Sequence, residues 1–70
     1  MTANAYKILE YLKLHNGVTA KEVSENVGIQ KRLVDSYFSA AIVGQGLGYR
    51  NNDTKPAALT LTTAGLEYNQ

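Results

Sequence analysis

Cysteine is missing from this sequence, so the chain has no disulfide framework and no thiolate metal site. An ordinary apolar core has to hold the fold without covalent cross-links. Such a composition is typical of proteins from a reducing interior. We therefore expect a cytoplasmic protein.

Long apolar runs are missing as well. No run approaches the roughly 18 to 20 residues that a membrane span requires, and the stretch MTANAYKILE lacks the basic and apolar segments of a secretion signal. We expect no membrane association. Because seven basic and six acidic side chains leave a net charge of +1, charge alone gives weak support to nucleic-acid binding, which depends on clustered cations.

The chain does contain enough apolar residues for a core, at 44% of its 70 residues. We expect a single domain over residues 1–70. At this size folding hides only about 60% of the surface that an unfolded chain exposes, so the free energy of unfolding is expected to be small.

The first apolar pattern predicts a helix that ends at Asn16-Gly17. Its apolar residues recur at spacings of three and four, the pattern of one buried stripe: Ala5, Ile8, Leu9 and Leu12. Gly17 suits the left-handed conformation that closes a helix.

A second, short helix is predicted to begin at a capping box. The Thr19 hydroxyl can accept from the Glu22 amide, and the Glu22 carboxylate can reach back to the Thr19 amide. Gly28 ends this helix, and Ile29 is expected to be an apolar plug before the next one.

The third helix is predicted to run from Gln30 or Lys31 to Val43 or Gln45. Its buried stripe comprises Val34, Tyr37, Phe38, Ala41 and Ile42. An advance of 100° per residue places Arg32, Ser36 and Ser39 on the outward face, with Asp35 and Leu33 on its flanks and Gln30 and Lys31 at the N-terminal tip.

Beyond this helix the apolar residues alternate with a period of two. Leu47 and Tyr49 form one such run and Leu59 and Leu61 another, with the turn-forming segment 51–56 between them. The pattern predicts a two-stranded hairpin with a polar tip, in which Tyr49 lies at the core or its edge. Thr62 or Thr63 is expected to cap a last helical turn.

This order of elements resembles the winged helix-turn-helix superfamily over nearly the whole chain. The run TAKEVSENVGI, residues 19–29, is similar to the T-x-x-E-[LV]-[AS]-E-x-[LV]-G-[IV] run that leads into the recognition helix of bacterial and archaeal regulators. LTTAG, residues 61–65, is similar to the L-T-x-x-G that closes the second strand of the wing. The resemblance implies an α+β winged helix, with a three-helix core, a hairpin wing and a short C-terminal helical segment.

The resemblance also implies sequence-specific binding of double-stranded DNA by a small transcriptional regulator. The residues expected to face DNA lie on the third helix and the hairpin: Gln30, Lys31, Arg32, Asp35, Ser36, Ser39, Arg50 and Lys55. A guanidinium at the tip of a helix in the major groove can pair with guanine or with a phosphate. Asp35 is expected to pair with Arg32 three residues earlier, and it can also accept from a cytosine amino group.

A homodimer is expected, because two subunits double the phosphate contacts. Its candidate interface is an apolar patch of Tyr6, Leu14 and Tyr68. The alternative is that these aromatic side chains pack locally across the termini.

Nothing in the sequence supports catalysis, and we expect neither an enzyme nor a cofactor. The glycines at 44, 46 and 48 lack the lysine and the following helix of a phosphate loop. The lone His15 is expected at the edge of the first helix rather than in a metal site. A protein-interaction adaptor remains the alternative function, because the same fold serves both purposes and Leu33 and Val43 are expected on the non-core side of the third helix.

Overall fold

The computed structural model describes residues 1–69, in which three helices precede a β-hairpin and a short helix follows it. The elements are α1 (Ala3–Leu14), β1 (Val18–Thr19), α2 (Ala20–Val27), α3 (Lys31–Tyr37), a π-helical segment (Phe38–Ile42), a 3-10 turn (Val43–Gln45), β2 (Gly48–Asn51), β3 (Ala58–Leu61) and α4 (Thr63–Glu67). Over the described residues this gives four α-helices and a three-stranded antiparallel sheet of order β1-β3-β2. The expected α+β class is confirmed, and the arrangement is compatible with a winged helix.

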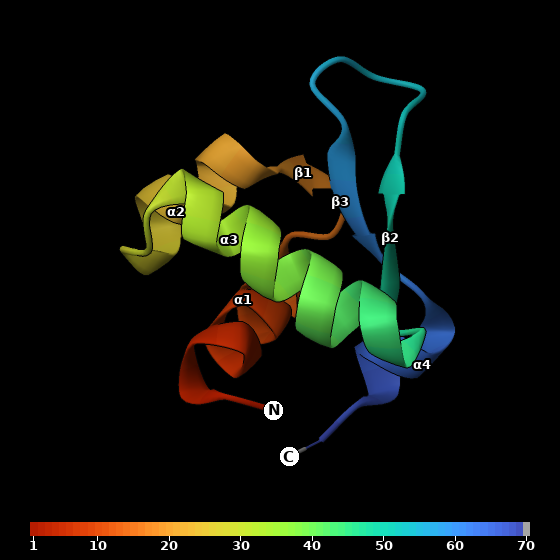
Figure 1. Cartoon of the computed structure of the whole chain (residues 1–70). Coiled ribbons are helices and arrows are strands. Elements are labelled where there is room, and N and C mark those ends of the chain that lie inside the picture. The colour runs from red at the N-terminus through yellow and green to blue at the C-terminus, as the bar shows by residue number, and fades with distance from the viewer. Residues whose placement is uncertain (70) are drawn as a thin grey trace.

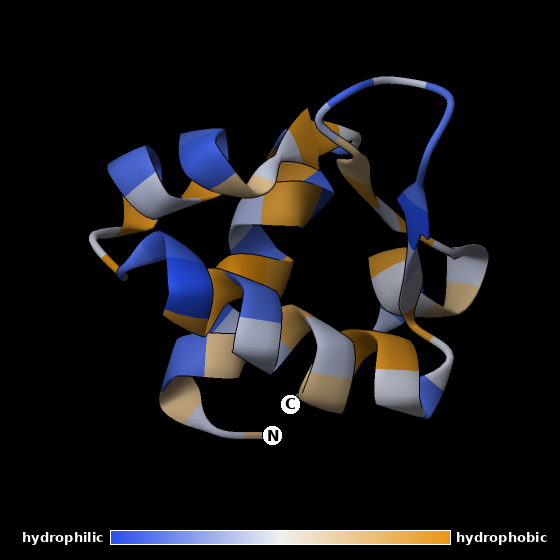
Figure 2. Ribbon diagram, turned by 45° about the horizontal axis from the view of Figure 1, so that its top comes forward, coloured by the Kyte–Doolittle hydropathy of each residue, from blue (hydrophilic) through white to orange (hydrophobic). Residues whose placement is uncertain are grey.

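The helices gather around one another, while the β2–β3 hairpin extends beyond them. Figure 1 shows α3 and its continuation crossing in front of α1, with the hairpin tip on the far side of the molecule from α4. The loop at that tip is hydrophilic in Figure 2. The end of α4 lies near the start of α1, where the rings of Tyr6 and Tyr68 are 6.5 Å apart.

Thr19 and Gly28 cap the two ends of α2 as predicted, but α1 ends at Leu14 with His15 as its C-cap, and the Gly17 amide donates to the Leu59 carbonyl at 3.1 Å. The Thr19 hydroxyl accepts from the Glu22 amide at 3.2 Å, and Gly17 and Gly28 have left-handed φ values of 80° and 74°. The second half of the predicted capping box is wrong. The Glu22 carboxylate instead accepts from the Tyr11 hydroxyl at 3.1 Å, so it ties α2 to α1.

The third helix has the predicted bounds but not a uniform geometry. It is α-helical to Tyr37, π-helical from Phe38 to Ile42 and 3-10 helical to Gln45, and Gly46 closes it with a φ of 72°. Phe38 and Ile42 both stay fully buried through the π-helical segment.

The sheet differs from the prediction in two ways. A short strand, β1, pairs Val18 with Leu59, and two residues are too few to show an alternating pattern in the sequence. Tyr49 is 47% exposed, so its placement at the core or its edge is wrong. Leu47 belongs to the turn before β2, where its amide donates to the Ile42 carbonyl at 2.8 Å, and Gly48 takes the core-facing position of the strand.

The core is the stripe of α1 covered by α2, α3 and β3. The four predicted stripe residues of α1 are fully buried, as are Val23, Val34 and Leu59. Leu33 packs half-buried against this core, so its expected place on the non-core side is wrong. Within the described residues, no helix combines the length and the apolar character needed to cross a membrane.

Gly65 is the residue of α4 that faces the core. A Cβ at this position would clash with the main-chain carbonyl of Leu47. The same carbonyl accepts from the Thr62 amide at 2.9 Å. The absence of a side chain at Gly65 therefore lets α4 pack closely on the turn before β2.

Leu12→Ala is expected to lower the free energy of unfolding by roughly 2 to 5 kcal/mol, because the side chain is fully buried in a small core. Lys7→Ala is the matched control on the same helix. Since Lys7 is exposed, this change is expected to cost less than about 0.5 kcal/mol. Urea denaturation followed by circular dichroism measures both, and equal losses would contradict the assignment of Leu12 to the core.

Candidate functional site

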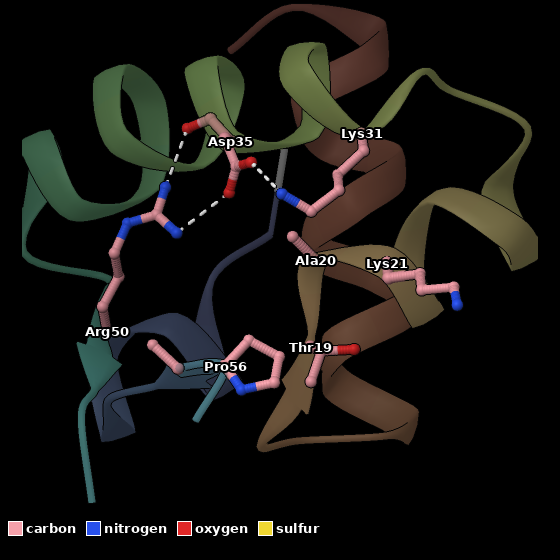
Figure 3. A pocket seen from close by; sticks show the side chains of 8 residues that line it. Thr19, Ala20, Lys21, Lys31, Asp35, Arg50 and Pro56 are labelled. Atoms are coloured by element: carbon pink, nitrogen blue, oxygen red, sulfur yellow. Dashed lines mark hydrogen bonds and ion pairs between the residues drawn. The ribbon is translucent and has the colours of Figure 1, made fainter. Parts of the chain in front are cut away.

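The start of α2, the start of α3 and the hairpin meet around one small pocket of about 110 Å³. It is lined by Thr19, Ala20, Lys21, Lys31, Asp35, Arg50, Pro56 and Ala57. Figure 3 shows the side chains of Lys31, Asp35 and Arg50 turned toward one another, while the amine of Lys21 points away from them. Segments far apart in the sequence thus bring cations to one surface.

Asp35 lies between two cations at the centre of this surface. One carboxylate oxygen accepts from Lys31 Nζ at 3.2 Å, and the other accepts from an Arg50 guanidinium nitrogen at 3.0 Å. The prediction that Asp35 pairs with Arg32 is therefore wrong. Lys31 lies one helical turn before Asp35 at a spacing of four, and Arg50 approaches from the neighbouring strand.

The pKa of Asp35 lies below its usual value. Partial burial of the carboxyl acts to raise the pKa, but the hydrogen bonds and positive charges of Lys31 and Arg50 outweigh that effect. The carboxylate is therefore ionised at neutral pH and stabilises the folded state through these two partners.

Arg50 makes more contacts than a free surface cation would. Its guanidinium donates to the Asp35 carboxylate, to the Asp35 main-chain carbonyl at 3.1 Å and to the Ser39 hydroxyl at 3.1 Å. It also lies 5.4 Å from the centre of the Phe38 ring, within the range of a cation–π contact. These contacts lie within the protein and hold the guanidinium against α3.

The other predicted DNA-facing residues are arranged as the helical spacing indicates. Gln30 and Arg32 are exposed at the start of α3, and Ser36 is exposed in its last turn. Ser39 is exposed but hydrogen-bonded to Arg50. Lys55 is exposed in the hairpin loop. The side chain of Lys31 remains 60% exposed despite its ion pair with Asp35.

Lys21 is a cation of this surface that sequence reasoning missed. It is exposed at the second position of α2 and lines the pocket with Lys31. The signal was available, because the predicted cap at Thr19 places Lys21 in the first turn of α2. The sequence does not show, however, that the start of α2 packs beside the hairpin.

The three residues of the predicted dimer patch are not equivalent. Tyr6 and Tyr68 are half-buried against each other, and Lys13 lies 5.9 Å from the Tyr6 ring and donates to the Tyr68 carbonyl. This local packing across the termini is the alternative that the sequence left open. Leu14 is different, because it is 81% exposed.

Within residues 1–69, no group of three or more His, Cys, Asp or Glu side chains is placed to hold a metal ion. His15 lies at the C-terminal end of α1, where its amide donates to the Tyr11 carbonyl at 2.9 Å and its ring stacks on the Tyr11 ring. This is the edge position expected from the sequence.

Comparison with protein-family models, with curated proteins and with solved structures finds no match to this chain. The resemblance to winged helix regulators therefore depends on its own motifs and on the arrangement of its elements.

Asp35→Asn is expected to lower the free energy of unfolding at pH 7 by up to about 1 kcal/mol, because the ion pairs are partly exposed. Since the folded pKa is depressed, this stabilisation is present above the ordinary carboxyl pKa of about 3.9 and is lost as the pH falls through the folded value. The difference between parent and variant should therefore shrink in acid.

Urea denaturation at pH 7 and at a series of acid pH values measures this difference. Asp53→Asn removes the same charge from the exposed hairpin loop and is the control, with an expected change below about 0.5 kcal/mol at pH 7. A difference between parent and Asp35→Asn that stays constant down to acid pH would contradict the ion-pair explanation.

Proposed function

We propose that the chain is a winged helix domain that binds double-stranded DNA with sequence preference, as a small transcriptional regulator of the cytoplasm. In this proposal the N-terminal half of α3 enters the major groove, and the hairpin lies along the neighbouring backbone. Arg32 and Gln30 contact base edges, while Lys21, Lys31 and Lys55 contact phosphates.

The observation that supports this proposal is the convergence of cations from separate elements. Lys21 of α2, Lys31 of α3 and Arg50 of β2 line one pocket, and exposed Arg32 lies beside Lys31. Phosphate binding is built from clustered cations, so this clustering matters more than the net charge of +1. Lys55 lies in the hairpin loop, which is hydrophilic in Figure 2, and the next residue, Pro56, lines the same pocket.

Because Arg50 is engaged in contacts within the protein, we do not expect it to contact a phosphate. Asp35 neutralises part of the charge of Lys31 and Arg50. The side chains left to contact phosphates or bases are Lys21, Lys31, Arg32 and Lys55. We therefore expect about three to four phosphates to be neutralised by each copy, with a corresponding slope of log affinity against log salt of roughly −3 to −4.

Arg32→Ala is expected to weaken binding more than Lys55→Ala, because a guanidinium in the major groove discriminates between bases by about 1 to 3 kcal/mol. Lys55→Ala is expected to weaken binding to all sequences alike and to reduce the salt slope by about one. Fluorescence anisotropy measures both effects, with a duplex enriched from a randomised pool and a duplex of unrelated sequence, at several salt concentrations.

Lys7→Ala is the matched control, since it removes an exposed cation from α1. It is expected to leave the affinity within about twofold of the parent, because Lys7 lies outside the proposed DNA-binding surface. The proposal is wrong if the parent binds no duplex at low salt, or if Lys21, Lys31, Arg32 and Lys55 can be removed together without loss of affinity.

We further propose that the chain binds DNA as a homodimer. A second copy doubles the phosphate contacts without new residues, and Leu14 supplies an exposed apolar side chain outside the DNA-binding surface. Tyr6 and Tyr68 pack on each other, so they contribute at most the edges of such an interface.

Leu14→Ser is expected to shift a dimer toward the monomer, because it removes apolar surface that a partner would bury. Sedimentation equilibrium between micromolar and millimolar concentrations measures the shift. Thr63→Ala, which changes an exposed residue of α4, is the control. A parent that stays monomeric throughout would contradict the dimer.

An adaptor that binds another protein is the competing function, and one observation favours it. Val43, Tyr49 and Leu66 are 39%, 47% and 45% exposed, and exposed large apolar side chains can take part in protein contacts. Failure of the duplex-binding experiment would replace the DNA proposal with this one.

A further inference from the structure

Arg50 is the side chain of β2 that reaches α3. Side chains of a strand alternate between its faces, so Gly48 and Arg50 share the face toward the helices while Tyr49 faces away. At Gly48 the strand lies so close to its neighbours that a Cβ would clash with the Ile42 side chain and the Thr60 carbonyl.

Arg50 lies near the outer end of β2, and its guanidinium donates to Asp35 of α3. It pairs with buried Leu59 on β3, and the exposed loop begins two residues later at Asn52. Figure 3 shows the guanidinium reaching across to the main chain and the carboxylate of Asp35. The tip of the hairpin extends beyond the helices in Figure 1.

The contacts of Arg50 need a guanidinium and not only a positive charge. One terminal nitrogen donates to the Asp35 carboxylate at 3.0 Å, and the other donates to the Asp35 carbonyl and to the Ser39 hydroxyl, both at 3.1 Å. A lysine ammonium is a single point charge on a flexible stem and cannot hold this planar arrangement.

We propose that Arg50 is a positioning residue, which fixes the hairpin against α3 so that Lys55 and Arg32 contact one duplex together. This inference rests on the proposed DNA binding, and it assigns Arg50 a role other than the direct phosphate contact that its charge suggests. The wing then acts as a rigid arm and not as a loosely attached loop.

Arg50→Lys separates the two roles, because it keeps the charge and loses the planar fork. If Arg50 positions the hairpin, Arg50→Lys and Arg50→Gln weaken duplex binding to a similar extent, about 3- to 10-fold. Lys55→Ala weakens binding of the parent about 2- to 5-fold. Added to Arg50→Lys or to Arg50→Gln, it is expected to weaken binding no further, because the hairpin is then no longer held in place. A direct phosphate contact gives the opposite result, with Arg50→Lys close to the parent and Lys55→Ala additive.

Amide hydrogen exchange, measured by NMR without DNA, provides an independent readout. We expect amides of residues 48–51 and 58–61 to exchange at least about fivefold faster in Arg50→Lys, while those of α1 keep their parental rates. In Asp35→Asn, Arg50 keeps two hydrogen-bond acceptors, the main-chain carbonyl of residue 35 and the Ser39 hydroxyl. The hairpin amides of this variant are therefore expected to show an intermediate increase in exchange rate.

Unchanged hairpin exchange in both Arg50 variants overturns the inference, whatever happens to DNA binding. Parental affinity in Arg50→Lys together with weaker binding in Arg50→Gln also overturns it. If the parent binds no duplex at all, the proposed function fails, and faster exchange confined to the hairpin still supports Arg50 as the residue that fixes it.

Discussion

The fold depends on the burial of one stripe of α1 beneath α3 and β3. Ile8 and Leu12 of that stripe, Phe38 of the π-helical segment and Leu59 of β3 are all fully buried. With no cysteine in the chain, no covalent link shares this task. Because a small domain is stabilised by only a few kcal/mol, each of these side chains accounts for a large fraction of the free energy of unfolding.

A second joint, between Asp35 and Arg50, connects the hairpin to α3 and lies at the surface. Exposed ion pairs contribute about 0 to 1 kcal/mol, far less than a buried core residue. Their importance here is therefore geometric, since three donated hydrogen bonds and the Phe38 ring restrict where the guanidinium can lie. Stability and orientation thus depend on different parts of the same small structure.

The sequence predicted those features whose causes are local. Helix ends set by Thr19 and Gly28, and the buried stripe of α1, follow from hydrogen bonding and spacing over a few residues. Features that depend on packing could not be read in this way. The prediction that Tyr49 faces the core was wrong because Leu47 is held in the turn before β2. The alternation of buried and exposed residues in β2 therefore begins with Gly48.

The candidate site shows the same division. The exposure of Arg32 and Ser36 follows from helical geometry, whereas the partner of Asp35 depends on a strand that lies 15 residues away in the sequence. Lys31 was also missed as a partner, since pairs at spacings of three and four are both possible on a helix and packing decides between them. Lys21 required knowledge of which helix end faces the hairpin.

The charges of the proposed DNA-binding surface limit how tightly one copy is expected to bind. Asp35 is held within this surface by Lys31 and Arg50, so it offsets one positive charge next to the place where phosphates would lie. The net charge of +1 adds little long-range attraction. Affinity in this proposal can increase through more phosphate contacts or through base contacts by Arg32. Since the chain has few other cations near this surface, a second copy is the simplest source of further phosphate contacts, and oligomeric state and DNA affinity are expected to change together.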